Sequence, residues 1–192
     1  MLNDKVMLGN TGIEVNRNGF GALPIQRISI EAAVEILRKA YDSGIEYFDS
    51  GRGYTDSEEK LGIALSDVRE NIVIATKTKA VKSEGFWVDL RTSLKMLKTD
   101  YIDVYQFHNP DFCPKPGDGT GLYEAMVEAK SQGLIRHIGI SNHRLPIAIE
   151  AVESGLYETI QFPFSYISID KEIELTKLCK KKGVGFVAMK GM

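Results

Sequence analysis

The stretch that decides the fold runs from Glu46 to Tyr54 and reads EYFDSGRGY. Its first residues are those of a short buried strand, which ends in the acid Asp49. A loop with two glycines follows and carries Tyr54. Two later strands also end in a lone polar residue: IVIATK ends in Lys77, and YIDVYQFH ends in His108. A carboxylate, a phenol, an ammonium and an imidazole near neighbouring strand ends form a set that can protonate a carbonyl.

Short apolar strands alternate with amphipathic helices on both sides of this stretch. The expected strands cover residues 18–25, 45–49, 72–77, 101–108, 135–141, 159–162 and 184–189. The expected helices cover residues 30–43, 86–97, 122–131, 146–154 and 170–182, with one more that opens at residues 55–58. Residues 5–16 look like a hairpin around Gly-Asn-Thr-Gly, and residues 109–121 are too rich in proline and glycine to be helical.

Strands that begin at intervals of roughly 24 to 34 residues, with helices between them, are typical of βα units and imply a parallel sheet. A doubly wound sheet would carry a glycine fingerprint at its first βα turn. The candidate, Gly19-Phe20-Gly21-Ala22-Leu23-Pro24, fails because a proline follows and no helix begins at once. We therefore predict an α/β chain of the TIM-barrel type, the (β/α)8 barrel, whose chemistry gathers at the carboxyl ends of the strands.

Composition excludes several other classes of protein. The formal net charge is −2, and no basic stripe is interleaved with aromatic residues, so we expect no nucleic-acid partner. No apolar run approaches eighteen residues, so we expect no membrane segment. Cys113 and Cys179 lie far apart, which favours a reducing, cytoplasmic location. The three histidines, His108, His137 and His143, do not resemble a metal-ligand set, so we expect no metal and rank a metal-dependent lyase low.

The proposed chemistry assigns a role to each polar residue near a strand end. Tyr54 would be the general acid, because reducing a carbonyl leaves negative charge on its oxygen. Lys77 would stabilise the tyrosine anion and so lower the pKa of the phenol, and Asp49 would hold Lys77 in place. His108 would donate a hydrogen bond to the substrate oxygen. Each residue also has an ordinary structural explanation, such as a helix cap or a surface aromatic. Their positions at or just after consecutive barrel strands favour a shared catalytic site over these separate explanations.

Four segments resemble the aldo-keto reductases closely: FDSGRGY at residues 48–54, IATK at 74–77, DVYQFH at 103–108 and GISN at 139–142. Their order and spacing match too, including the five-residue step from Asp49 to Tyr54. The opening LGNTGIEV at residues 8–15, followed by Gly19-Phe20-Gly21, is similar to the family's hairpin across the barrel floor and its first strand. The resemblance covers the whole chain, and residues 53–62 look most like a microbial branch.

The resemblance implies a function and a site. Asp49, Tyr54, Lys77 and His108 would be the catalytic tetrad, and the chain would reduce aldehydes or ketones with NADP or NAD, with NADPH favoured. Ser141, Asn142 and Gln161 match positions that hold the nicotinamide carboxamide. Met189 stands where the family often has an aromatic residue over the nicotinamide ring. Some members of this branch carry a carboxyl-terminal iron–sulfur segment, for which this sequence has no cysteine cluster.

The resemblance also predicts an incomplete barrel. We expect residues 1–192 to form one domain that lacks the family's seventh helix, eighth strand and eighth helix. The open edges would be covered by further chain in a longer protein, which we favour, or by self-association with a second copy. Two alternatives to an active reductase stay open: a non-catalytic nicotinamide-binding or regulatory barrel, and an inactive fragment of a longer reductase.

Overall fold

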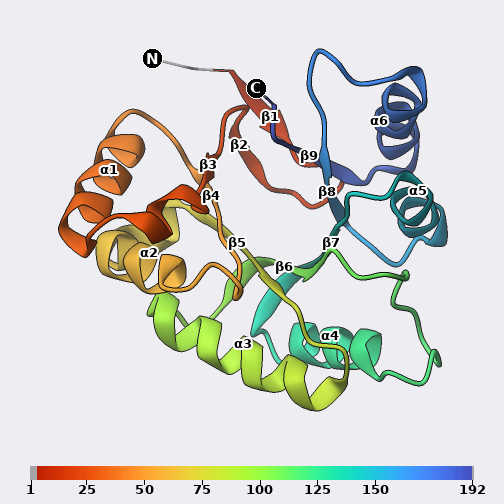
Figure 1. Cartoon of the computed structure of the whole chain (residues 1–192), viewed down its shortest axis with the longest axis horizontal. Helices are drawn as coiled ribbons and strands as arrows, with labels where there is room; N and C mark the ends of the chain where they lie inside the picture. The colour runs from red at the N-terminus through yellow and green to blue at the C-terminus, as the bar shows by residue number, and fades with distance from the viewer. Residues whose placement is uncertain (1–3, 192) are drawn as a thin grey trace.

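The computed structural model describes residues 4–191 and contains one curled parallel sheet (Figure 1). Its seven strands follow the order β3-β4-β5-β6-β7-β8-β9, so every strand pairs with its neighbour in sequence. The strands are β3 (Phe20–Gly21), β4 (Tyr47–Asp49), β5 (Val73–Thr78), β6 (Ile102–His108), β7 (Ile135–Ser141), β8 (Thr159–Pro163) and β9 (Gly185–Met189). All six pairings are parallel, which confirms the predicted barrel type.

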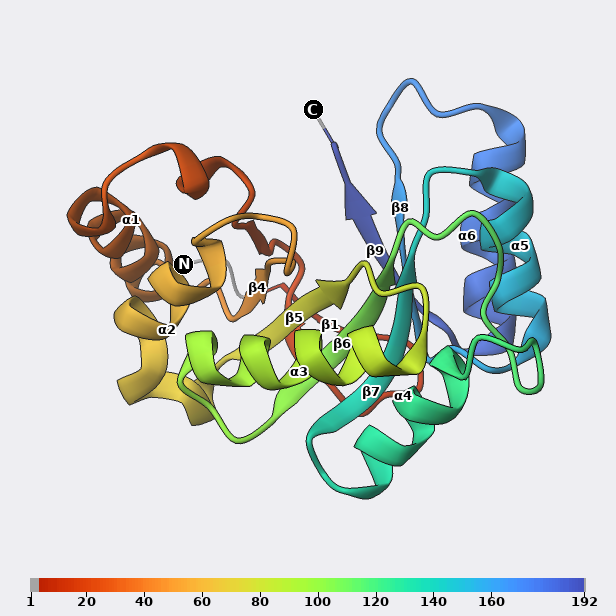
Figure 2. The same ribbon diagram turned by 60° about the horizontal axis from the view of Figure 1, so that its bottom comes forward.

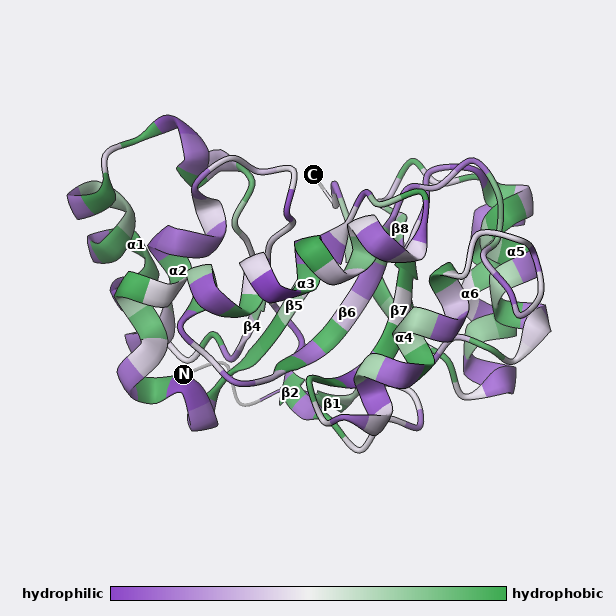
Figure 3. Cartoon of the chain, turned by 90° about the horizontal axis from the view of Figure 1, so that it is seen from below, coloured by the Kyte–Doolittle hydropathy of each residue, from purple (hydrophilic) through white to green (hydrophobic). Residues whose placement is uncertain are grey.

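The helices lie on the outer face of this sheet, as Figures 1 and 2 show. They are α1 (Ile30–Asp42), α2 (Ser57–Leu65), α3 (Ser83–Leu97), α4 (Leu122–Ser131), α5 (Leu145–Ser154) and α6 (Asp170–Lys182), with short 3-10 turns η1 (Pro24–Arg27) and η2 (Ser66–Asn71). Figure 3 shows green and purple segments alternating along the helix ribbons, as expected when one face of a helix is buried and the other is wet. No helix among residues 4–191 is long and apolar enough to cross a membrane.

Local sequence explains where the helices begin and end. The hydroxyl of Ser29 accepts a hydrogen bond of 3.2 Å from the backbone N–H of Ala32 and so caps the start of α1. Ala33 and Leu37, one turn apart, are the fully buried residues of that helix. The chain leaves α1 through Gly44, whose φ of +94° is strained for any other residue type.

A two-stranded hairpin, β1 (Lys5–Met7) and β2 (Glu14–Asn16), packs against the amino ends of the barrel strands, as predicted. Its turn reaches the segment between α6 and β9, because the N–H of Asn10 donates a 2.8 Å hydrogen bond to the carbonyl of Gly183. Leu8 and Val15 belong to an apolar cluster with Tyr47, Ala75 and Val104 from the barrel strands. The hairpin therefore fills the floor of the barrel with apolar side chains.

The first barrel strand is shorter than predicted. The pattern indicated a strand over residues 18–25, but β3 covers two residues and the 3-10 turn η1 begins at Pro24. A side chain from another element fixes this turn. The buried ammonium of Lys60 in α2 donates hydrogen bonds of 2.9 and 2.7 Å to the carbonyls of Ile25 and Ile28. The prediction of an extended segment was wrong here because a long-range contact decides the local conformation.

A buried charged cluster joins the amino ends of β5, β6 and β7. Asp103 accepts hydrogen bonds from Arg69 (2.6 Å), from Arg136 (3.2 Å) and from the backbone N–H of Ile74 (2.9 Å). The Tyr101 ring lies between the two guanidinium groups, 4.0 Å from that of Arg69 and 3.7 Å from that of Arg136. Each charge in the cluster is therefore paired, hydrogen-bonded or stacked.

This cluster makes a prediction about stability. Replacing Asp103 by alanine leaves the buried guanidinium of Arg69 without its carboxylate, so we expect the free energy of unfolding to fall by about 3 kcal/mol. Urea unfolding measures the change. Asp100→Ala is the matched control, because Asp100 is exposed and forms no ion pair within the described chain. Equal stability losses in the two variants would contradict the structural role of the cluster.

Candidate active site

The candidate site lies inside the barrel, toward the carboxyl ends of β4, β5, β6 and β8. Strand register sets the level of its side chains: Lys77 pairs with Gln106, and Ser141 pairs with Gln161. Side chains two residues apart on a strand point to the same face. The lumen face of β5 and β6 thus carries apolar Ala75 and Val104 below and polar residues above them.

Lys77 is the centre of this site. Its ammonium lies 2.7 Å from each carboxylate oxygen of Asp49 and 2.5 Å from the carbonyl oxygen of Ser50. The side chains of Lys77 and Asp49 are only 2% and 12% exposed. Since an ammonium has three N–H donors, these three oxygens satisfy it completely. The lysine is therefore held in one orientation.

Two amide side chains complete the surroundings of Asp49. Gln161 donates a 3.1 Å hydrogen bond to one carboxylate oxygen, and Gln106 donates a longer one of 3.4 Å to the other. Gln106 also lies 3.4 Å from the amide oxygen of Gln161. The carboxylate is thus hydrogen-bonded from three strands, as a buried charge requires.

Tyr54 stands over this pair in the loop after β4. The Lys77 nitrogen lies 5.3 Å from the centre of the Tyr54 ring, and the rings of Tyr54 and His108 meet edge to face at 5.4 Å. The tetrad predicted from the sequence is therefore brought together, with Asp49 and Lys77 below and Tyr54 and His108 above. Gly51 lies beside this contact: a side-chain carbon there would meet the tyrosine ring at 3.4 Å and the histidine ring at 3.5 Å, both ordinary van der Waals distances.

The loop that carries Tyr54 is fixed by a buried carboxylate. Glu58 pairs with Arg52 and also accepts hydrogen bonds from the hydroxyls of Thr76 (2.6 Å) and Ser93 (2.7 Å). Next to the tyrosine, Thr55 has a φ of +46°, a left-handed conformation that is unfavourable for a β-branched residue. The Glu58 contacts thus hold a strained loop in place.

The pKa of Tyr54 differs in direction from the prediction. Burial of the phenol, followed by repulsion from Asp49, raises its pKa to about 12. The sequence predicts instead that Lys77 lowers this pKa. Lys77 does not do so because Asp49 already neutralises it, and no hydrogen bond joins Lys77 to Tyr54 among the described residues. The phenol is therefore fully protonated near neutral pH.

His108 is a neutral imidazole in this site. Burial, and then the positive charges of Lys77 and Lys79 and the neighbouring His143, lower its pKa to about 3. Its Nδ1 atom is buried and has no hydrogen-bond partner among residues 4–191. A neutral imidazole carries one N–H donor, which suits it to hydrogen bonding with an uncharged carbonyl.

The residues predicted to hold the nicotinamide carboxamide lie at the end of β7 and within β8: Ser141 ends β7, Asn142 follows it, and Gln161 is in β8. The Ser141 hydroxyl donates a 3.3 Å hydrogen bond to the carbonyl of Phe107. Asn142 faces the loop after β6: its amide N–H donates to the carbonyl of Pro110 at 2.8 Å, and its amide oxygen accepts from the backbone N–H of Arg144. Met189 is the last residue of β9, and no described contact joins it to the tetrad.

Sequence reasoning missed three residues of the site: Gln106, Arg52 and Glu58. Gln106 was detectable, because it lies two residues before His108 and four after the start of β6, on the face that alternation assigns to the lumen. The ion pair between Arg52 and Glu58 could not be detected in this way. Arg52 lies in a loop and Glu58 in a helix, and their spacing in the sequence does not show that the two side chains meet.

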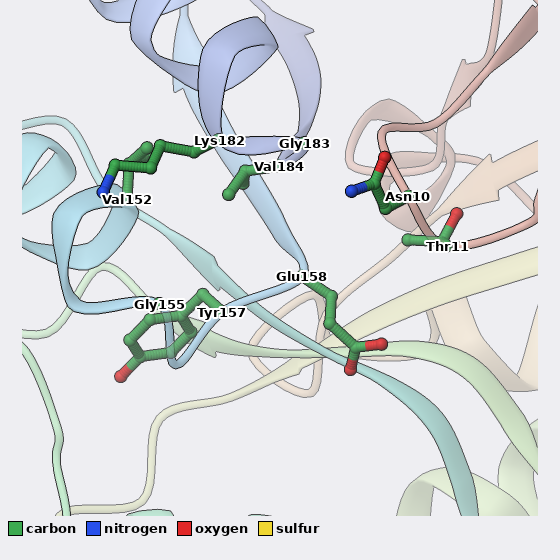
Figure 4. Close-up of a pocket in the computed structure, with 9 residues that line it drawn as sticks. All are labelled: Asn10, Thr11, Val152, Gly155, Tyr157, Glu158, Lys182, Gly183 and Val184. Atoms are coloured by element: carbon green, nitrogen blue, oxygen red, sulfur yellow. The ribbon is translucent and has the colours of Figure 1, made fainter.

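The pocket in Figure 4 lies at the other end of the barrel. It has a volume of about 190 Å³ and is lined by the hairpin turn, the residues before β8 and the end of α6. Its carboxylate, Glu158, is already engaged by Lys130 and His137. None of the predicted site residues lines this pocket.

A curled parallel sheet with polar side chains gathered at the carboxyl ends of its strands is the architecture of barrel enzymes. The Aldo/keto reductase family model matches residues 17–192. L-galactose dehydrogenase from Arabidopsis thaliana is 30% identical over 201 residues, which cover 94% of this chain and 63% of that protein. The NADH-specific methylglyoxal reductase from Escherichia coli is 27% identical over 210 residues, covering 94% and 64%.

A solved structure agrees with the family match. The holo form of an aldo-keto reductase from Bacillus halodurans is 28% identical and superposes with a TM-score of 0.85, covering 96% of this chain and 65% of that one. The chain therefore belongs to the aldo/keto reductase family, which confirms the predicted resemblance. It spans less than two thirds of the length of the two curated relatives named above.

The depressed pKa of His108 predicts how stability depends on pH. Unfolding returns the imidazole to its ordinary pKa of 6.5, so the unfolded chain binds an extra proton between about pH 6.5 and pH 3. This contribution to stability is present above pH 6.5 and is lost as the pH falls. Between pH 7 and pH 5 we expect the free energy of unfolding to fall by roughly 1 to 2 kcal/mol because of His108.

Urea unfolding at both pH values checks this, with His108→Gln as the comparison. The variant should lose less stability on acidification than the natural chain, since glutamine does not titrate. An identical pH dependence in both chains would show that His108 does not titrate on unfolding.

Proposed function

We propose that this chain carries the catalytic centre of an NAD(P)H-dependent oxidoreductase that reduces aldehyde or ketone carbonyls to alcohols. The observation that carries the proposal is the buried Lys77–Asp49 pair, which lies directly beneath the contacting rings of Tyr54 and His108. Membership of the aldo/keto reductase family supports the same activity.

In this proposal Tyr54 is the general acid. Its raised pKa keeps the proton on the phenol until charge develops on the substrate oxygen, which then takes the proton from the tyrosine hydroxyl. Neutral His108 contributes an N–H that hydrogen-bonds the same oxygen and orients the carbonyl. Lys77 and Asp49 act as positioning groups in this proposal: they hold each other in one orientation beneath the Tyr54 ring.

A nicotinamide cofactor supplies the hydride when it is bound, and this chain has groups that fit it. Ser141, Asn142 and Gln161 together keep free amide N–H donors and oxygen acceptors beyond the bonds they already make. These are the groups that a carboxamide requires. Met189 would cover the ring face with its polarizable thioether. Family resemblance favours NADPH, although the Escherichia coli relative is named for NADH.

We further infer that residues 1–192 fold as one domain. One cluster of buried apolar side chains runs from Ala22 to Val184, through every helix and barrel strand between them. In this proposal the edges of β3 and β9 are covered in the working protein by further chain or by a second copy. The substrate is a small carbonyl compound, and we expect the protein to work in the cytoplasm.

The Tyr54→Phe variant tests the mechanism. Removing only the hydroxyl oxygen should lower carbonyl reduction by at least about 10²-fold, the lower end of what a general acid contributes. The affinity for the cofactor should stay within about twofold, because Ser141, Asn142 and Gln161 are untouched. The measurement is steady-state oxidation of NADPH with a panel of aldehydes, made on this chain and on the whole translated frame that contains it. Unchanged turnover in Tyr54→Phe would rule out the assigned role.

A non-catalytic nicotinamide-binding barrel is the second candidate function. It is favoured by the full engagement of Lys77: its three N–H donors are taken by Asp49 and Ser50, so that none is left for Tyr54. Titration of NADPH and NADH, followed by nicotinamide fluorescence, separates the two candidates. Tight binding without oxidation by any aldehyde supports the binding protein, whereas measurable oxidation supports the reductase.

A further inference from the structure

Lys79, two residues beyond Lys77, lies against the loop that carries Tyr54. A side-chain carbon built on Gly53 would lie 3.0 Å from Cε and 3.1 Å from Nζ of Lys79. The lysine stem therefore occupies the space that the absent side chain at position 53 leaves open. Its ammonium lies beside the residue that precedes the candidate general acid.

This ammonium has no partner in the described chain. Lys79 forms no ion pair or hydrogen bond with any residue from 4 to 191, and its side chain is exposed. The nearby carboxylates are already occupied: Asp49 binds Lys77, Glu58 binds Arg52, and Asp89 accepts from the hydroxyl of Thr78. The Lys79 ammonium is therefore a positive charge beside the site that no carboxylate among residues 4–191 pairs with.

Strand order places this charge on one side of the site. Thr78 pairs in register with Phe107, so Lys79 lies at about the level of His108. The residues proposed to hold the nicotinamide lie on or directly after β7, β8 and β9, on the other side of β6. Lys79 follows β5 and is separated from them by His108. The Lys79 ammonium therefore lies on the side of His108 that faces away from the proposed nicotinamide position. The part of the substrate beyond its carbonyl group would lie on this side.

We propose that Lys79 binds an acidic group of the substrate, so that the preferred substrates are aldehydes or ketones that also carry a carboxylate or a phosphate. This inference rests on the proposed reductase function and specifies the substrate class of the same site. An ammonium attracts an anion as a compact point charge and gives charge-assisted hydrogen bonds, which are stronger than neutral ones. Lys79 touches no reacting atom in this proposal; it is a specificity residue.

A surface lysine is ordinarily solvated and contributes little. Lys79 differs because its stem packs along Gly53, and because its charge is close enough to lower the pKa of His108. A substrate anion at this position would meet a charge that is already held beside the site. Less side-chain freedom would then be lost on binding than for a free lysine.

The test compares two aldehydes that differ only in charge: 4-carboxybenzaldehyde and its neutral methyl ester, methyl 4-formylbenzoate. In Lys79→Met we expect kcat/KM for the acid to fall about tenfold, mainly through KM, and kcat/KM for the ester to change less than twofold. Lys79→Arg should keep most of the preference for the acid. Lys95→Met is the control, because it removes one exposed positive charge from the last turn of α3, far from the carboxyl ends of the strands.

A second pair, glyceraldehyde 3-phosphate and glyceraldehyde, identifies the acidic group. A larger loss for the phosphate pair than for the carboxylate pair assigns the site to phosphates, and the reverse assigns it to carboxylates. If Lys79→Met leaves the ratio of acidic to neutral substrate unchanged in both pairs, the proposal is overturned.

The proposed function and this inference can fail separately. If the natural chain oxidises NADPH with neither acidic nor neutral aldehydes, the reductase function fails. The anion site is then measured by calorimetry with benzoate and benzamide. If Lys79→Met binds benzoate more weakly than the natural chain does, and benzamide equally well, the anion site is supported. If the natural chain and the variant bind each ligand equally well, the proposal is overturned.

Discussion

The structure depends on one buried ion pair, that between Lys77 and Asp49. Removing both charges from water is costly unless every donor and acceptor finds a partner, and here three neighbouring groups supply the partners: the Ser50 carbonyl and the amides of Gln106 and Gln161. The bond from Gln161 to Asp49 joins residues 112 apart in sequence and crosses the lumen from β8 to β4. It forms only when the sheet curls. The ion pair at the centre of the site and the curvature of the barrel are therefore mutually dependent.

The two ends of the barrel have different tasks. The amino ends of the strands carry the apolar hairpin floor and the fully paired cluster around Asp103, both of which are structural. The carboxyl ends carry the tyrosine, the neutral imidazole and an unpaired ammonium, which are groups with remaining capacity to bind. This division matches the general behaviour of parallel barrels, in which function lies at the carboxyl ends. The pocket of Figure 4, at the amino end, belongs to the structural half.

Much of this arrangement was predictable from the sequence, because hydrophobic period and strand-end polar residues are local properties. The strands, the helices and the meeting of Asp49, Tyr54, Lys77 and His108 follow from them. The short β3, the pair between Arg52 and Glu58, and the raised pKa of Tyr54 do not. Each depends on which side chains contact one another in the folded chain, and a pattern of residue types does not encode that. The tyrosine is the clearest case: spacing shows a lysine nearby, but not that its charge is already neutralised.

The left-handed backbone of Thr55 carries a wider consequence. A threonine in this conformation costs on the order of 1 kcal/mol relative to residues that adopt it freely, such as glycine. A chain optimised for thermal endurance alone would place glycine there. The same exchange would give the backbone beside Tyr54 more freedom, so that the tyrosine side chain would be held less firmly against His108. Stability of the fold and a firmly positioned tyrosine thus oppose each other at a single residue.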